Sequence, residues 1–166
     1  EHLVDHLTDR NEPASTWEEF RKDTELLSRP DNSFERFSVS GVAMGRVDNI
    51  KYGVDIMQNI MLQMGAKFFT PDGSRVIFTE SMGRDSQGEK VNFASEAINF
   101  YTSFADARYK NFAWSEFLSA PDTPHKNFET FVKGKVSMVF GYSQDYQVIK
   151  SLLGAPGTIS ENNLRV

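Results

Sequence analysis

The stretch that most constrains the fold of this chain runs from residue 127 to residue 146, NFETFVKGKVSMVFGYSQDY. Its first part is an amphipathic helix pattern, and Gly134 can take the left-handed conformation that ends such a helix. A short apolar run follows at 136–140, which predicts a buried strand. A helix that leads through a glycine into a buried strand indicates an α/β layer. The apolar residues on the helical face are Phe128, Phe131 and Val132.

A polar, aromatic segment ends this predicted strand. It consists of Gly141, Tyr142 and Ser143, and Ser143 is a residue type that caps helices. We therefore expect a further helix whose first turn carries Asp145, where a carboxylate favours the helix dipole. Open α/β sheets place their ligands at the carboxyl ends of strands, which makes this tip a candidate ligand loop.

The first half of the chain repeats the alternation of helix and strand. Thr16 and Glu19 form a capping-box pattern, which predicts a helix start, and residues 30–33 predict a loop that ends this helix. Residues 37–44 predict a strand that ends at Gly45. The polar segment 46–53, RVDNIKYG, follows that strand and is a second candidate ligand loop.

Two further helices are predicted from apolar residues at helical spacing. The first covers 54–64, closes at Gly65 and carries a row of methionines typical of core packing. The second covers 93–105, with Asn92 as its cap. Its predicted buried face consists of Ala94, Ala97, Ile98, Tyr101 and Phe104.

Between these helices, residues 67–80 predict a surface hairpin around a Pro-Asp-Gly turn. Residues 81–91 are polar and predict a solvated loop, because the acidic residues Asp72, Asp85 and Glu89 lack the spacing of a calcium loop. Residues 107–126 break periodicity and bring four aromatic side chains close together. These are Tyr109, Phe112, Trp114 and Phe117.

Composition excludes several functional classes. The chain has 166 residues and 14 Phe, enough for a sizeable core. Its net charge is −5 and its basic residues are scattered, so we expect no binding of nucleic acid. It has no Cys, which excludes disulfides and thiol chemistry. We also expect no membrane-spanning helix.

Residues suited to catalysis are few. The three histidines, His2, His6 and His125, lie in polar segments, and no serine stands in a glycine-flanked elbow. The pair His2 and His6 has a metal-ligand spacing but no evident third ligand. No phosphate-binding glycine loop is present. We therefore expect a protein that is not an enzyme and needs no cofactor or metal. Carboxylate pairs for glycoside hydrolysis can be drawn from Glu18, Glu19, Asp48, Glu80 or Glu116.

The order of helix, Lys-Gly-Lys, strand and Gly-Tyr-Ser resembles the sugar-binding type of extracellular solute-binding protein of ABC importers, related to maltose-binding protein. Four other segments match that family in order: TWEEF at 16–20, SGVAMG at 40–45, QMGAKFF at 63–69 and ASEAINFYTSFAD at 94–106. The resemblance implies the periplasmic-binding-protein type II fold, with residues 1–166 as one partial carboxy-terminal α/β lobe of two. It also implies an extracellular or periplasmic location, with an export signal or lipid anchor upstream of residue 1.

The same resemblance implies a solute, most simply a carbohydrate, held between two lobes that close around it and dock on a membrane permease. Sugars are bound by planar polar side chains and by aromatic faces. The residues of those kinds in the expected ligand loops are Arg46, Asp48, Asn49, Tyr52, Trp114, Tyr142 and Ser143.

Structural alternatives stand beside these assignments. Trp114 can be a buried anchor of its loop, Arg46 can pair with Asp48 at the surface, and Ser143 can serve only as a helix cap. For the whole chain, the alternatives are a ligand-free scaffold with exposed sheet edges and a carbohydrate-active enzyme with two carboxylates facing one cleft.

Overall fold

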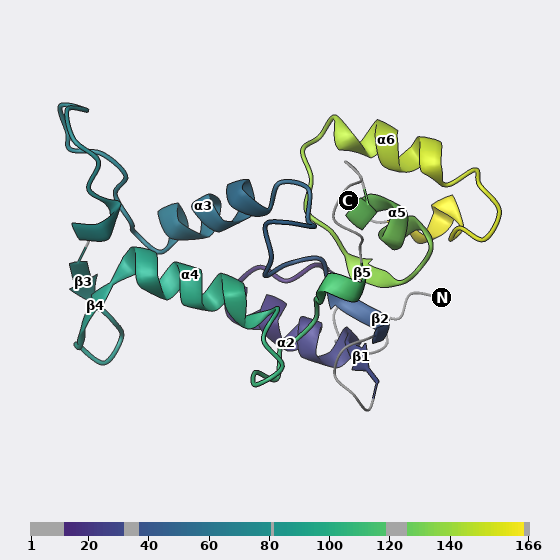
Figure 1. The fold of residues 1–166 in the computed structure, drawn as a ribbon, viewed down its shortest axis with the longest axis horizontal. Coiled ribbons are helices and arrows are strands. Elements are labelled where there is room, and N and C mark those ends of the chain that lie inside the picture. Colours follow the sequence, from purple (N-terminus) through teal and green to yellow (C-terminus); the bar gives the residue numbers. More distant parts are fainter. Residues whose placement is uncertain (1–11, 32–36, 81, 119–125, 165–166) are drawn as a thin grey trace. The chain divides into compact units, whose positions relative to one another are not determined.

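The computed structural model describes residues 12–31, 37–80, 82–118 and 126–164, and within these residues the fold is mixed α/β, with five α-helices and two small sheets (Figure 1). The described residues group into two compact units. The first unit combines the chain up to Gly53 with the chain from Ser103 onward, and the second comprises Val54–Thr102. None of the described helices combines the length and apolar composition needed to cross a bilayer.

The sheet of the first unit joins segments that are far apart in sequence. Strand β2 (Phe37–Val42) lies between β1 (Arg29–Pro30) and β5 (Val136–Met138). It pairs antiparallel with β1 and parallel with β5, with Ser40 opposite Val136. The predicted strands are therefore present, but β2 ends at Val42 rather than Met44, and β5 ends at Met138 rather than Phe140.

Helix α2 (Trp17–Leu27) begins at the predicted capping box. The Thr16 hydroxyl accepts the Glu19 N–H at 3.2 Å, and the Glu19 carboxylate accepts the Thr16 N–H at 3.2 Å. The prediction that Pro30 lies in a loop is wrong, since Pro30 belongs to β1 and pairs with Phe37. Proline is tolerated there because β1 is an edge strand, where no partner needs its missing N–H.

The core of the first unit is largely aromatic. Phe20 of α2 packs on Phe140 and on Phe104, with ring centroids 5.5 and 6.0 Å apart. Phe140 thus lies beyond the end of β5 and contributes to the core by packing against Phe20 of α2. A second cluster joins α5 (Lys126–Val132) and α6 (Asp145–Leu152) through Phe128, Val132 and Ile149.

Two glycines of the first unit are fixed by geometry. Gly134 has φ of +67°, as predicted for the turn from α5 into β5. Gly45, after β2, has φ of +108°, and a Cβ there would lie 2.6 Å from the backbone nitrogen of Ala105. The chain can therefore leave β2 along this path only with glycine at position 45.

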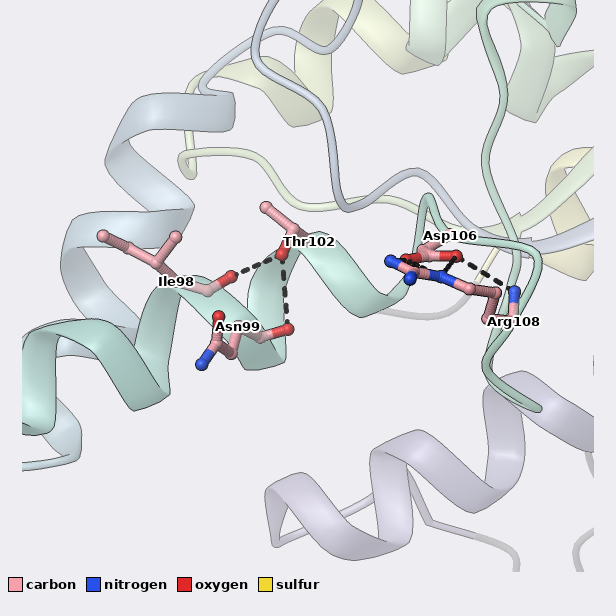
Figure 2. A network of polar contacts seen from close by, with 5 residues as sticks. All are labelled: Ile98, Asn99, Thr102, Asp106 and Arg108. Carbon is pink, nitrogen blue, oxygen red and sulfur yellow. Dashed lines mark hydrogen bonds and ion pairs between the residues drawn. The ribbon is translucent and has the colours of Figure 1, made fainter. Parts of the chain in front are cut away.

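The second unit contains the two predicted helices, α3 (Gly53–Gln63) and α4 (Phe93–Ser103), except for their boundary residues Gly53 and Ser103. The Asn92 side chain accepts the Ser95 N–H at 2.9 Å, which confirms it as the cap of α4. In the last turn, the Thr102 hydroxyl donates to the carbonyl of Ile98 at 2.9 Å (Figure 2). The predicted buried face of α4 is confirmed at Ala94, Ala97 and Tyr101, but Ile98 is 37% exposed.

The prediction of a solvated loop at 81–91 is wrong. Strands β3 (Met82–Arg84) and β4 (Lys90–Asn92) form an antiparallel hairpin in this region. The turn is built by Asp85, whose carboxylate accepts the N–H groups of Gln87 and Glu89, each at 2.9 Å. The sequence of these strands lacks the alternation of apolar and polar residues that predicts a strand. The hairpin is stabilised instead by the hydrogen bonds of Asp85 in its turn.

The predicted Pro-Asp-Gly hairpin is present as a single antiparallel bridge between Phe69 and Val76. Its turn is closed by the Gly73 N–H, which donates to the Thr70 carbonyl at 2.8 Å. Three short 3₁₀ turns complete the described structure, at Phe78–Glu80, Glu116–Leu118 and Glu161–Asn163.

Candidate functional site

The loops that follow β2 and β5 come together, because the two strands are parallel neighbours. Tyr52 from the first loop and Tyr142 from the second pack edge to face, with ring centroids 4.8 Å apart and an interplanar angle of 83°. Tyr142 is 51% exposed and Tyr52 is half-buried. The sequence predicts both residues at strand ends, and the structure adds that they are in contact.

Tyr52 is held in an unusual backbone conformation. Its φ is +65°, which makes it the one residue other than glycine with positive φ in the part of the chain that the structure describes. A bulky side chain in this region costs about 1–3 kcal/mol and persists only where surrounding contacts hold it. The contacts here are the Tyr142 ring and the Asp145 carboxylate, which accepts the Tyr52 hydroxyl at 3.1 Å.

Asp145 ties the two loops together from beneath. One of its oxygens accepts the Lys51 ammonium at 2.7 Å and the Tyr52 hydroxyl, and the other accepts the Tyr142 N–H at 2.8 Å. Burial raises the pKa of Asp145, but the hydrogen bonds from Lys51, the Tyr142 N–H and Tyr52 outweigh it, so the pKa lies below its ordinary value. Asp145 is therefore a carboxylate whose charge is compensated inside the protein.

Lys51 lies among aromatic rings. Its ammonium nitrogen is 4.6 Å from the ring centroid of Tyr52 and 5.2 Å from that of Phe128. Burial lowers the pKa of Lys51, but the hydrogen bond to Asp145 outweighs it, and the pKa is raised. Both members of the pair are thus ionised at neutral pH.

Asn127, at the start of α5, completes this cluster. It is buried, and its side-chain oxygen accepts the Lys51 N–H at 3.3 Å. Its amide nitrogen has no hydrogen-bond partner among the described residues. Sequence reasoning missed Lys51 and Asn127 as site residues and assigned Asp145 only to a helix turn. The available signal was one lysine in a loop predicted to adjoin a buried strand.

Arg46 and Asp48 form the surface pair that was the alternative to a ligand-binding role. The Arg46 guanidinium donates to both oxygens of Asp48, at 2.9 and 2.6 Å, and lies 3.9 Å from Glu116. The hydrogen bond from Arg46 lowers the pKa of Asp48, and the same bond raises the pKa of Arg46. The charges of Arg46 and Asp48 in the loop after β2 therefore compensate each other, as those of Lys51 and Asp145 do.

The idea that Trp114 is an exposed stacking platform is wrong, and the alternative of a buried anchor is confirmed. Trp114 is fully buried, and its indole N–H donates to the Asn49 side-chain oxygen at 2.9 Å. The Asn49 amide nitrogen donates in turn to the Ser115 carbonyl at 3.3 Å. Asn49 and Trp114 thus fix the loop after β2 to the segment before α5.

Ser143 does not cap α6. The N-cap position is occupied by Gln144, which makes no side-chain capping bond, and Ser143 is exposed. Asp145, the first residue of the helix, accepts the Tyr142 N–H, which lies before the helix, so this bond holds the loop against α6 but does not cap it.

A separate groove of about 380 Å³ lies elsewhere on the first unit, between α2, β1 and residues 107–112. Arg108 lines this groove and is paired with Asp106, at 2.5 Å between Nη2 and Oδ2 (Figure 2). The hydrogen bond from Arg108 lowers the pKa of Asp106 to about 2. We call Lys51, Tyr52, Tyr142 and Asp145 together the tyrosine site. None of these four residues lines the groove.

In the stretches that the structure describes, no three His, Cys, Asp or Glu side chains are grouped so that they could hold a metal ion. The histidines considered above, His2, His6 and His125, lie outside the described residues. Comparisons of this chain with protein-family models, with curated proteins and with solved structures found no match.

Proposed function

We propose that this chain is the carbohydrate-binding part of an extracellular or periplasmic solute-binding protein that serves an ABC importer. The observation that supports this best is the meeting of Tyr52 and Tyr142 at the carboxyl ends of two parallel strands. Ligands of open α/β sheets bind at such strand ends.

The chemistry of this place suits a sugar. Tyrosine offers a ring face for the apolar C–H patches of a pyranose and a hydroxyl for its polar groups. Tyr142 is 51% exposed, and Tyr52 packs against its ring edge to face. The ionised groups beneath the rings are paired with each other, so the site supplies polar contacts without a strong net charge.

In this proposal the chain contributes one lobe of type II architecture, and a second lobe closes over the solute. The closed form then docks on the membrane permease. Contacts from both lobes are needed for full affinity. If the second lobe supplies about 4 kcal/mol of contact energy, the 166-residue chain alone binds about a thousandfold more weakly.

The test is calorimetric titration of the full-length protein, and of the 166-residue chain, with a panel of neutral mono- and oligosaccharides. We expect the Tyr142→Ala variant to lose at least about tenfold in affinity, which corresponds to about 1.4 kcal/mol of lost stacking. Tyr109→Ala is the matched control, because Tyr109 is 50% exposed and Tyr142 is 51% exposed. Tyr109 lines the separate groove between α2, β1 and residues 107–112. Equal affinities for both variants would contradict the proposed site.

A scaffold role is the second candidate, favoured by the position of β5 in its sheet. Among the described strands, β5 pairs with β2 alone and therefore leaves one edge open to a further strand. Concentration-dependent self-association, measured by sedimentation, together with the absence of saccharide binding by the full-length protein, would support this role instead.

A further inference from the structure

We propose that Asp145 is a specificity-determining residue, which masks the charge of Lys51 and so makes the tyrosine site select uncharged saccharides over uronic acids. The inference rests on the proposed carbohydrate-binding function and names the chemical class of the solute. It concerns the charge that a ligand meets at the Tyr52 and Tyr142 rings.

Lys51 is the cation that a ligand at these rings would meet. Its ammonium lies 4.6 Å from the centre of the Tyr52 ring, and its side chain is 19% exposed. The side chain of Asp145 is only 3% exposed and lies 2.7 Å from the ammonium. The carboxylate therefore neutralises Lys51 from the buried side while the lysine keeps a face toward solvent.

Asp145 has little capacity left to bind a ligand itself. Both of its oxygens already accept hydrogen bonds, from Lys51 and Tyr52 on one side and from the Tyr142 N–H on the other. Its effect on a ligand is therefore electrostatic and acts through Lys51. The other cation of the loop, Arg46, is compensated by Asp48 and Glu116.

A uronic acid carries a carboxylate where the neutral sugar carries a hydroxymethyl group. Moving that carboxylate from water to a site without an available cation is costly, because its hydration is lost without compensation. A neutral sugar avoids this cost. The paired Lys51 thus favours the neutral member of any pair of sugars that differ only in this group.

The experiment compares the affinities of the full-length protein for glucose with glucuronate, and for galactose with galacturonate. It is run at about pH 6, far below the ordinary lysine pKa of about 10.4, so that Lys51 is charged. We expect the wild type to prefer the neutral sugar by at least about tenfold. In Asp145→Asn, which keeps the side-chain shape and removes the charge, we expect the preference to shift toward the uronate by at least about tenfold.

Two further variants separate charge from shape. Lys51→Gln combined with Asp145→Asn removes both charges and is expected to restore the preference for the neutral sugar. Asp106→Asn removes a carboxylate of the same unit that is paired with Arg108 and not with Lys51, and is expected to leave the ratio unchanged. If the role of Asp145 were purely structural, Asp145→Asn would lower the affinities for both sugars by the same factor. An unchanged ratio of the two affinities in folded Asp145→Asn overturns the inference.

The wild type alone decides the matter if Asp145→Asn does not fold, because equal or tighter binding of the uronate contradicts a masked Lys51. The inference fails separately from the function on which it rests. Neutral-sugar binding with an unmoved ratio overturns the inference alone, whereas failure to bind any saccharide overturns the proposed function together with it.

Discussion

Asn49 acts structurally through two hydrogen bonds that join the loop after β2 to the segment before α5. It accepts the indole N–H of Trp114, 65 residues away in sequence, and donates to the Ser115 carbonyl. All three groups are buried, so none can exchange its partner for water. A buried donor that loses its acceptor costs about 1–3 kcal/mol.

We therefore expect Asn49→Ala to lower the free energy of unfolding by about 2 kcal/mol, since it leaves the Trp114 indole N–H without a partner. Urea denaturation followed by tryptophan fluorescence measures this. Asn59→Ala, at an exposed position of α3, serves as the control and should change stability by less than about 0.5 kcal/mol. Similar values for the two variants would show that the buried pair contributes nothing specific.

At the scale of elements, helix α2 depends on its first turn. The capping box of Thr16 and Glu19 satisfies two backbone N–H groups that no helical carbonyl can reach. The helix then contributes Phe20 and Leu27 to the aromatic core and packs along β2. Stability lost at the cap is therefore lost to the whole unit.

Thr16→Ala is expected to cost about 0.5–2 kcal/mol of stability, because it removes the acceptor for the Glu19 N–H. Thr16→Ser keeps that acceptor and should recover most of the loss. Ser86→Ala, in the exposed turn of the β3–β4 hairpin, gives the baseline for losing a surface hydroxyl. If Thr16→Ala and Ser86→Ala unfold at the same urea concentration, the cap does not stabilise the fold.

At the scale of the whole molecule, the paired carboxylates make stability depend on acid. The pKa values of Asp72 and Asp106 are lowered to about 2, and those of Asp48 and Asp145 are lowered as well. Asp72 is exposed and Asp106 is partly exposed and paired with the exposed Arg108, so solvent screens the effect of both. Asp145 is buried between two loops and a helix, and its ionisation matters most.

The sign follows from the direction of these shifts. Each carboxyl has a lower pKa in the folded chain than in the unfolded chain, so the unfolded chain binds more protons as the pH falls. The stabilisation is present above the ordinary value of about 3.9 and is lost as the pH falls through the lowered pKa values, which for Asp72 and Asp106 are about 2. We expect urea midpoints to be level from about pH 5 to 7 and to drop below about pH 4.

The Asp145→Asn variant tests which group leads this acid response. It should start from a lower stability at pH 7 and show a shallower fall below about pH 4, because the buried carboxyl no longer titrates. Asp72→Asn is the solvated comparison and should keep nearly the full wild-type slope. An unchanged slope in Asp145→Asn would assign the acid response to the surface carboxyls.

Much of this fold could be predicted from neighbouring residues alone. Contacts within one helical turn decide the caps at Thr16 and Asn92 and the left-handed turn at Gly134. The predicted amphipathic helices likewise follow from residues three and four positions apart. Such contacts involve residues three or four positions apart, so their pattern is readable in the sequence. The place of the candidate site after the two strands was likewise predictable, although each apolar run continues two residues beyond its strand.

The tertiary structure alone decided which of those residues do what. It buried Trp114 against Asn49 and joined Lys51 to Asp145 across 94 residues. It also folded residues 82–92 into a hairpin. Residues so far apart in sequence become partners only when folding brings their segments together. No pattern of spacing along the sequence indicates which segments these are.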